Sequence, residues 1–439
     1  MKVLKFGGTS VGSPERMKNV AKLINNGEKN IIVLSAMSGT TNSLVEIADY
    51  YSKNNLESAK AMINTLRTKY SKDISELYTS KKAQQDTLQL LDQIFSRLLA
   101  FGEMRLTESD KKEILSKGEI MSTNMMTNYL KEQGVKVTLI SAFDFMRLDE
   151  NGEPDMKFLA DTLNPILKQH SETEIFITQG FICLNNANQI DNLQRGGSDY
   201  SASLIGAAIK AEEIQIWTDI DGMHNNDPRI VDNTKPVHQL HFEEAAELAY
   251  FGAKILHPTC VQPAKFAGIP VRLLNTMDPA AQGTIINNYT EEGKIKAVAA
   301  KDNITVIKIV SSRMLLATGF LRKVFEIFEQ YHTSIDVVTT SEVGVSMTID
   351  NDSYLANILE ELKKYGTVNV DRDMCIICVV GDLRTCNKGF ESIITSALKK
   401  VPVRMISYGG SNHNISFIIR EADKTLALQE LSRNIFNQD

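Results

Sequence analysis

Apolar residues recur near the start of the chain in short runs that end in small polar residues. Lys2–Phe6 and Asn30–Ala36 are such runs, and loops of glycine, serine and threonine follow both. Between them, Ser13 is placed to cap a helix that has Pro14 at its first position. This pattern predicts strand, loop, helix and strand, the opening of a parallel α/β sheet whose ligands bind beyond the carboxyl ends of the strands.

Periodicity predicts the next elements. An apolar stripe through Leu88, Leu91, Phe95 and Leu98 is part of a region, from about residue 44 to 132, expected to be helical throughout. Glu119 is expected at a helix start within it; whether the region closes over a substrate stays open. Further strands are expected at 135–140, 174–182, 213–219 and 271–275, and further helices at 156–169 and 242–251.

The run Asn192–Ala208 combines an arginine, paired glycines, a serine and an aspartate just before a predicted helix. Glycine lets backbone N–H groups approach a ligand, and a helix N-terminus favours an anion. Arg195 and Asp199 would complete an anion site. The alternative is a tight turn capped by Ser198 or Asp199.

The composition loosens at 287–296, where we expect a domain boundary. Beyond it, strands and amphipathic helices alternate in two units, 304–349 and 369–419, which form a weak βαββ repeat. Such a module suits ligand binding or dimerisation. A chain of 439 residues is expected to form two or three domains.

The net charge and the cysteine content narrow the class of protein to which the chain can belong. A net charge of -6 gives no support for nucleic-acid binding, and no signal peptide or membrane-spanning run is expected. Five scattered cysteines fit reduced thiols in a cytoplasmic protein. Cys375 and Cys378 have zinc spacing, but they lie in an apolar run without a second ligand pair. We therefore expect a buried strand there and no metal site.

Four segments with charged or polar side chains are expected at one edge of the sheet. They are Lys5 before Gly-Gly, Arg195 to Asp199, Thr218 with Asp219, and Lys254 in a Gly-Ala-Lys loop. Lysines, arginine and glycine N–H donors suit a polyphosphate, since phosphoryl transfer needs positioning and charge neutralisation. The Walker A and protein-kinase signatures are absent, and no Ser/His/Asp triad presents itself. His257, before a proline, is expected to be structural.

The sequence resembles the amino acid kinase family and, within it, the aspartokinases, over nearly its full length. The motifs are Lys5–Val11, Ser35–Asn42, Gly118–Ser122, Arg195–Ala202, Trp217–Asp219, Asp227–Arg229 and Phe251–Pro258. Each alone is modest evidence, and in this order they are specific. The resemblance implies an α/β fold: a three-layer α/β/α kinase domain with a mainly parallel central sheet over 1–290. Two α+β ACT regulatory domains of βαββαβ type would follow over 297–439, the first (about 312–380) inserted into the second.

The resemblance also implies the reaction: transfer of the γ-phosphoryl group of ATP with Mg²⁺ to the side-chain carboxylate of L-aspartate. The product, 4-phospho-L-aspartate, leads to lysine, threonine and methionine. An aspartate carboxylate, with a pKa of about 3.9, needs no general base at neutral pH, which fits the lack of a convincing one. Lysine is the implied inhibitor, with threonine as the alternative, and a cytoplasmic homodimer through the ACT domains, or a tetramer, is the implied assembly. No nucleic acid or membrane partner is expected.

By resemblance, three sets of residues form the active site. The catalytic residues are Lys5, Asp199 and Lys254. The aspartate pocket comprises Thr41, Glu119 for the ammonium, Arg195 for a carboxylate, and Ser198. The nucleotide site comprises Lys5, Gly7, Gly8, Thr218, Asp219, His224, Arg229, Lys254 and Ile255. Related enzymes commonly carry Tyr at position 224 and Thr at 226, so His224 and Asn226 leave the nucleotide contacts open.

An effector site is implied at Met314, Gly319, Leu321, Ser334, Asp336, Thr340, Ser341 and Glu342. Ordinary core packing is the alternative for Met314 and Leu321, because apolar spacing does not separate the two.

Two other functions compete with this interpretation. A different amino acid kinase, acting on glutamate, acetylglutamate, carbamate or a nucleoside monophosphate, is disfavoured by Glu119, Arg195 and the ACT tail. A catalytically silent amino-acid sensor would have lost Lys5, Asp199 or Lys254, and all three are present.

Overall fold

The computed structural model describes residues 1–193, 196–252, 256–314, 318–384 and 388–436. The chain forms two compact units. The first comprises residues 1–223 and 255–288, and the second comprises residues 224–254 and 289–439. The domain limits expected from the sequence stay a prediction; the second unit also takes in residues 224–254.

The first unit contains most of the predicted sheet. Its strands are β1 (Lys2–Phe6), β2 (Asn30–Leu34), β3 (Val137–Leu139), β4 (Ile175–Gln179), β5 (Ile182–Leu184), β6 (Ile190–Asn192), β7 (Ile214–Thr218), β9 (Val271–Asn275) and β10 (Thr284–Asn287). Its α-helices are α1 (Pro14–Ile24), α2 (Thr40–Ser52), α3 (Leu56–Leu77), α4 (Lys81–Ala100), α5 (Glu108–Glu132), α6 (Ala142–Phe145), α7 (Met156–Gln169), α8 (Gly197–Ile209) and α10 (Gln262–Ala267).

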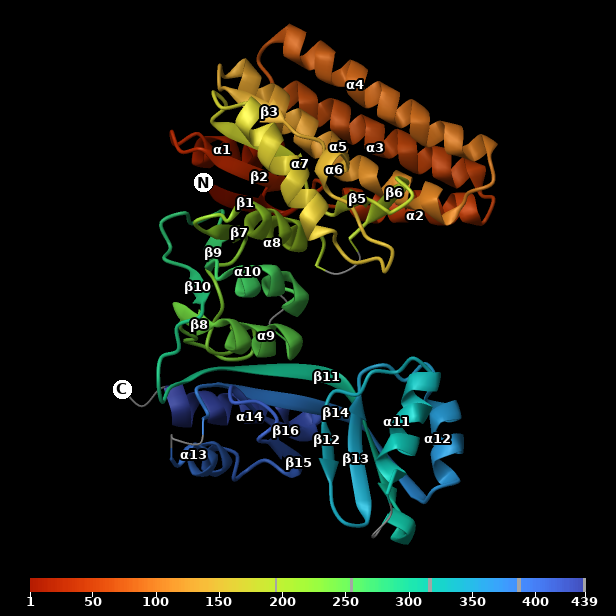
Figure 1. The fold of residues 1–439 in the computed structure, drawn as a ribbon, viewed down its shortest axis with the longest axis vertical. Helices are drawn as coiled ribbons and strands as arrows, with labels where there is room; N and C mark the ends of the chain where they lie inside the picture. Colours follow the sequence, from red (N-terminus) through yellow and green to blue (C-terminus); the bar gives the residue numbers. More distant parts are fainter. Residues whose placement is uncertain (194–195, 253–255, 315–317, 385–387, 437–439) are drawn as a thin grey trace. The chain divides into compact units, whose positions relative to one another are not determined.

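Seven strands of this unit follow the order β3-β4-β2-β1-β7-β9-β10, and β5 and β6 form a separate two-stranded sheet. All neighbours pair in parallel except β9 and β10, which are antiparallel. Alternation along β1 assigns its faces: Leu4 and Phe6 join the core formed with α1 to α5. Val3 and Lys5 therefore point to the opposite face, where α8 packs (Figure 1). The predicted three-layer α/β/α fold with a mainly parallel sheet is confirmed.

Helices α2, α3, α4 and α5 confirm the predicted helical region. The prediction that Glu119 lies at a helix start is wrong, since Glu119 lies in the middle of α5. A capping box between Thr107 and Asp110 begins that helix earlier. Gly118 lies in mid-helix, where any larger residue would clash, because a Cβ there would lie 2.7 Å from the Cβ of Ala36. Close packing, not a helix end, explains this glycine.

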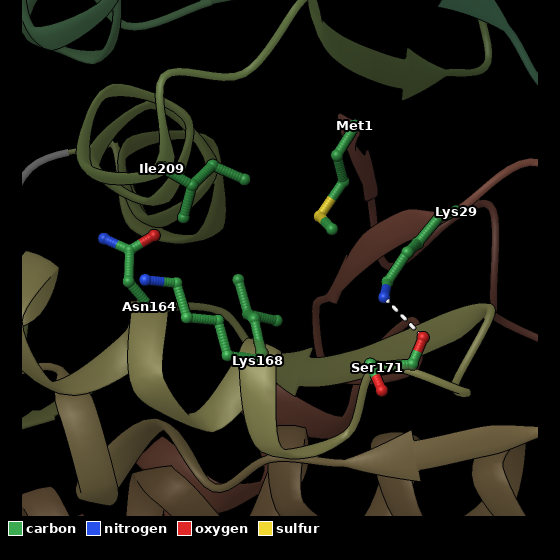
Figure 2. A pocket seen from close by; sticks show the side chains of 7 residues that line it. Met1, Lys29, Asn164, Lys168, Ser171 and Ile209 are labelled. Carbon is green, nitrogen blue, oxygen red and sulfur yellow. Dashed lines mark hydrogen bonds between the residues drawn. The ribbon is translucent and has the colours of Figure 1, made fainter.

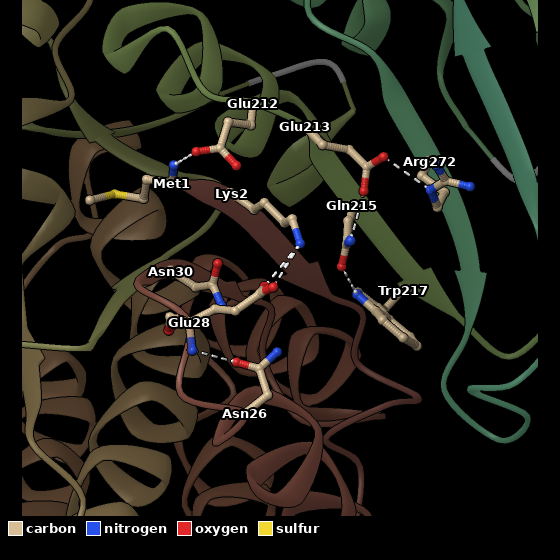
Figure 3. Close-up of polar contacts among 10 residues, drawn as sticks. All are labelled: Met1, Lys2, Asn26, Glu28, Asn30, Glu212, Glu213, Gln215, Trp217 and Arg272. Atoms are coloured by element: carbon tan, nitrogen blue, oxygen red, sulfur yellow. Dashed lines mark hydrogen bonds and ion pairs between the residues drawn. The ribbon is translucent and has the colours of Figure 1, made fainter.

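Polar contacts tie down the amino-terminal side of the sheet (Figure 3). The N-terminal ammonium pairs with Glu212, and Lys2 pairs with Glu28 at 2.9 Å. Arg272 on β9 pairs with Glu213 at 3.0 Å. These pairs hold neighbouring strands in register at the edge opposite to their carboxyl ends.

The second unit contains the predicted repeat. Its strands are β8 (Gln239–His241), β11 (Ile295–Val310), β12 (Val338–Thr340), β13 (Gly344–Ile349), β14 (Thr367–Gly381), β15 (Val403–Tyr408) and β16 (Asn414–Arg420). Its α-helices are α9 (Phe242–Tyr250), α11 (Phe320–Gln330), α12 (Leu355–Lys363), α13 (Phe390–Ala397) and α14 (Lys424–Leu431). Helices α12 and α14 were not among the predicted elements.

Six strands of this unit form one antiparallel sheet in the order β12-β13-β11-β14-β16-β15. Each half consists of a long central strand and an outer hairpin, as expected for the repeat. Cys375 and Cys378 are fully buried on β14, so the prediction of a buried strand is confirmed. Within the described ranges, no helix has the length and apolar character needed to cross a membrane.

Candidate active site

Lys5 and Asp199 meet at the carboxyl edge of the sheet. Lys5 Nζ lies 2.6 Å from Asp199 Oδ1, and both side chains are largely buried. Asp199 stands in the first turn of α8, preceded by Gly196 and Gly197 with φ values of 72° and 52°. This left-handed conformation favours glycine, which explains the paired glycines before the helix. The geometry thus places a cation and a carboxylate beside a helix N-terminus.

A chain of short contacts extends from this pair. Ser198 Oγ accepts a hydrogen bond from Ser35 Oγ at 2.9 Å, just beyond the end of β2. The backbone N–H of the next residue, Ala36, donates to Glu119 Oε1 at 3.2 Å. Four predicted site residues therefore lie along one connected edge: Lys5, Asp199, Ser198 and Glu119.

Glu119 is almost wholly buried, with 4% of its surface exposed. Burial raises the pKa of its carboxyl group to about 7, although the N–H of Ala36 favours the ionised form. No ion pair joins this carboxyl group to a cation among the residues that the structure describes. A buried carboxylate in this condition is a ready partner for a cationic ligand.

The predicted glycines and small polar residues line the same edge. Gly7 donates its N–H to the carbonyl of Trp217 at 3.4 Å, and a Cβ on Gly8 would lie 2.8 Å from the carbonyl oxygen of Ala36. Thr41 is exposed in the first turn of α2. At the end of β7, Thr218 Oγ1 donates to Asp219 Oδ1 at 3.2 Å, and Asp219 is exposed.

The remaining predicted active-site residues lie either outside the described residues or in the second unit. Arg195, Lys254 and Ile255 lie outside the described residues. His224 and Arg229 belong to the second unit. His224 Nδ1 contacts Thr234 Oγ1 at 2.9 Å, whereas Arg229 forms a bidentate pair with Asp227 in its own loop.

The predicted effector residues all lie in the second unit. Met314 packs against the core of the first repeat, Gly319 caps α11 with a φ of 81°, and Leu321 is 36% exposed on that helix. Exposed positions on or beside β12 are Ser334, Thr340, Ser341 and Glu342. Asp336 is different, because its side chain is fully buried.

Three residues beside the site were not among the predicted site residues, although one of them, Ser35, begins the Ser35–Asn42 motif. Ser35 Oγ bridges to Ser198, and its carbonyl accepts from Ser122 Oγ at 2.8 Å. Buried Gln179 accepts from the N–H of Ala142 and donates to Thr123 Oγ1. Phe181 has a φ of 66°, which is strained for a bulky residue. Ser35 could have been found from its place in the Ser35–Asn42 motif, near the end of a predicted strand, but the backbone of Phe181 carries no sequence signal.

A pocket of about 370 Å³ lies at the opposite edge (Figure 2). Met1 and Lys29, which precede β1 and β2, line it, and Lys29 Nζ donates to the carbonyl of Ser171 at 2.9 Å. Ligands of parallel sheets bind beyond the carboxyl ends of the strands. This pocket therefore does not belong to the Lys5–Glu119 edge.

Known proteins match both regions of the chain. Residues 1–275 match the amino acid kinase family, and residues 377–435 match an ACT domain. Aspartokinase 1, chloroplastic, of Arabidopsis thaliana is 36% identical over 99% of this chain and 80% of its own length. Lysine-sensitive aspartokinase 3 of Escherichia coli is 34% identical over 99% of both chains.

Solved structures of aspartokinases are also similar to this chain. E. coli aspartokinase III in complex with aspartate and ADP (R-state) has a TM-score of 0.83 and 32% identity, covering 99% of this chain and 100% of that one. The same enzyme in complex with lysine and aspartate (T-state) has a TM-score of 0.80 and 33% identity, covering 99% of each chain. The chain therefore belongs to the amino acid kinase family. Within that family it falls among the aspartokinases, and it is an aspartate kinase with an ACT domain.

Proposed function

We propose that this enzyme transfers the γ-phosphoryl group of Mg-ATP to the side-chain carboxylate of L-aspartate and forms 4-phospho-L-aspartate, the first step towards lysine, threonine and methionine. The observation that carries the proposal is the connected edge from Lys5 to Glu119. It offers a cation for a phosphoryl group and a buried carboxylate for an ammonium group. The similar E. coli enzyme was solved with aspartate and ADP, which supports the same pair of ligands here.

In this proposal, the ionised carboxylate of the substrate attacks the γ-phosphorus, and ADP leaves. No residue has to remove a proton from the nucleophile, because an aspartate side chain is ionised at neutral pH. Lys5 neutralises charge that develops on the transferring group, and Asp199 holds the ammonium of Lys5 in place across 2.6 Å. Glu119 receives the substrate ammonium, and Ser198 completes the pocket. Arg195 and Lys254 keep the roles expected from the resemblance.

We also propose that lysine inhibits the enzyme through the ACT domains, with Asp336 as the main polar contact. The buried carboxylate of Asp336 pairs with Lys301 at 3.0 Å and accepts a hydrogen bond from the Tyr250 hydroxyl. An ammonium-bearing effector would compete with Lys301 for this carboxylate. The E. coli T-state complex with lysine supports this choice of effector.

The assembly belongs to the proposal too. Homodimers are expected through the regulatory sheet, whose outer strands β12 and β15 expose Val338, Val403 and Ile406. The cytoplasmic location expected from the sequence stays a prediction.

The test is ATP-dependent formation of an acyl phosphate from L-aspartate, trapped as the hydroxamate with hydroxylamine, with and without millimolar lysine or threonine. Aspartate-dependent hydroxamate that lysine suppresses is the expected result. Product that ignores lysine would remove the regulatory half of the proposal. Lysine binding without any product would favour an amino-acid sensor.

A further inference from the structure

A cluster of two histidines and a glutamate lies in the second unit, apart from every residue used above. His241 caps the N-terminus of α9, Glu243 stands in the first turn of that helix, and His413 directly precedes β16. One ligand atom from each residue lies within 4.8 Å of the other two. The fold thus brings His413 close to His241 and Glu243, which lie more than 150 positions earlier in the sequence.

The geometry holds these side chains facing one another. His413 Nε2 lies 3.0 Å from Glu243 Oε2, and the two imidazole rings stack 5.1 Å apart at an interplanar angle of 14°. The backbone around His413 is fixed as well, since its carbonyl accepts from Gly381 N–H at 3.0 Å. Beside it, Asn414 Nδ2 donates to Glu247 of α9. The cluster is therefore preorganised on two regular elements.

Burial supplies a second, independent observation. His413 is 6% exposed, and its Nδ1 atom is buried with no hydrogen-bond partner among the described residues. An unpaired buried polar atom is costly, and a bound water or ion is one of the explanations for such an atom in a native structure. A metal ion bound at Nδ1 would supply the missing partner, and one bound at Nε2 would replace the contact with Glu243 Oε2.

His241 brings a second imidazole to the cluster. Its Nδ1 accepts the N–H of Glu243 at 3.2 Å, a long hydrogen bond. A metal ion at Nδ1 would replace this bond, whereas an ion at Nε2 would leave it in place. The second cap contact remains, because Glu244 Oε2 accepts the N–H of His241 at 2.7 Å. The N-terminus of α9 therefore stays capped when the metal ion binds.

We propose that His241, Glu243 and His413 form a binding site for a divalent transition-metal ion of the Zn²⁺ class. Two imidazoles and a carboxylate are the donors that such ions prefer, and three protein ligands leave a fourth position for water. Mg²⁺ prefers an octahedron of oxygens, so the metal of Mg-ATP is a poor fit. The ion would join α9 to β16 and stabilise the folded second unit by mass action.

The test is Zn²⁺ binding to the full-length protein after treatment with EDTA, measured by calorimetry and by the thermal unfolding midpoint. We expect about one ion per chain and a higher midpoint, neither of them reproduced by Mg²⁺. Co²⁺ in place of Zn²⁺ should give the intense visible absorption of a tetrahedral site.

Three variants make the test specific. His241→Ser removes a ligand but keeps a side chain that caps helices well, and Glu243→Gln changes a half-exposed ligand. Each should weaken Zn²⁺ binding at least about tenfold, on the scale of lost metal-site partners. His332→Asn is the control, because His332 lies in the same unit at a φ of 47°, which asparagine tolerates. Absence of Zn²⁺ binding, or binding that both ligand variants leave unchanged, would overturn the proposal.

Discussion

Buried carboxylates lie in both units of the molecule, and they differ in the groups that bind their oxygen atoms. Glu119 of the first unit accepts one backbone N–H, and burial raises its pKa to about 7. Asp336 of the second unit has Lys301 and Tyr250 as partners, and Lys301 is shared with Asp350 at 2.9 Å. A carboxylate that lacks a cation from the protein is suited to receive one from a substrate. A carboxylate that already has one is suited to a ligand that competes for it.

The largest expected effect comes from removing the cation at the first of these sites. Lys5→Met should lower turnover at least about 100-fold, the scale for losing one preorganised charge-stabilising group. Lys2→Met is the matched control, because Lys2 lies on the same strand but pairs with Glu28 at the opposite edge. Steady-state assays of both variants give the answer. Near-normal turnover in Lys5→Met would remove Lys5 from the mechanism.

Glu119→Gln sharpens the comparison through two readouts of opposite sign. It should lower kcat/KM for aspartate by roughly 10- to 100-fold, the value of a hydrogen bond to a charged group. It should also raise the free energy of unfolding at pH 8 by roughly 1–3 kcal/mol, since a neutral amide avoids burying a charge. Chemical denaturation measures the second effect. A variant that loses stability at pH 8 would mean that Glu119 is paired within the protein.

The carboxyl group of Glu119 should also make both the stability and kcat/KM for aspartate depend on pH. The folded protein holds the Glu119 proton up to about pH 7, whereas the unfolded chain releases it near pH 4.5. Glu119 therefore lowers stability as pH rises between these values, and the penalty is complete above pH 7. Only the ionised form attracts an ammonium group, so kcat/KM for aspartate should rise through about pH 7. A profile that is flat there, or shared by Glu119→Gln, would contradict this assignment.

Asp336→Ala probes the second site. We expect the lysine concentration for half-inhibition to rise at least about tenfold, within the usual range of coupling, while turnover stays intact. Asp350→Ala is the control, because it removes the more exposed partner of Lys301 and leaves Asp336 in place. Inhibition curves for the two variants separate the roles. Unchanged inhibition in Asp336→Ala would place the effector elsewhere.

The smallest effect is expected at Glu113, on the same helix as Glu119. Arg97 and Lys117 hold the pKa of Glu113 at about 2, so its stabilisation is present above pH 4.5 and is lost as pH falls through 2. Glu113→Gln should cost about 1 kcal/mol at pH 7, allowing for solvent screening, without changing kcat/KM. A gain in stability would remove the contrast between paired and unpaired carboxylates on this helix.

The sequence predicted the parts of the site that depend on local pattern. Lys5 ends an apolar strand, and Asp199 follows paired glycines at a helix start, so both could be placed at one sheet edge. Glu119 was misplaced because Gly118 resembles a helix boundary, whereas its role is close packing against Ala36. The pairing of His241 with His413 depends on contacts between distant segments, which periodicity does not report.

The most direct test of the account compares L-aspartate with succinate, which has both carboxylates but no ammonium group. Hydroxamate formation from each substrate would be measured for the wild-type enzyme and for Glu119→Gln. The account predicts a preference for aspartate of at least about 100-fold in the wild type, and a much smaller preference in the variant. An undiminished preference in Glu119→Gln would show that another group recognises the substrate ammonium.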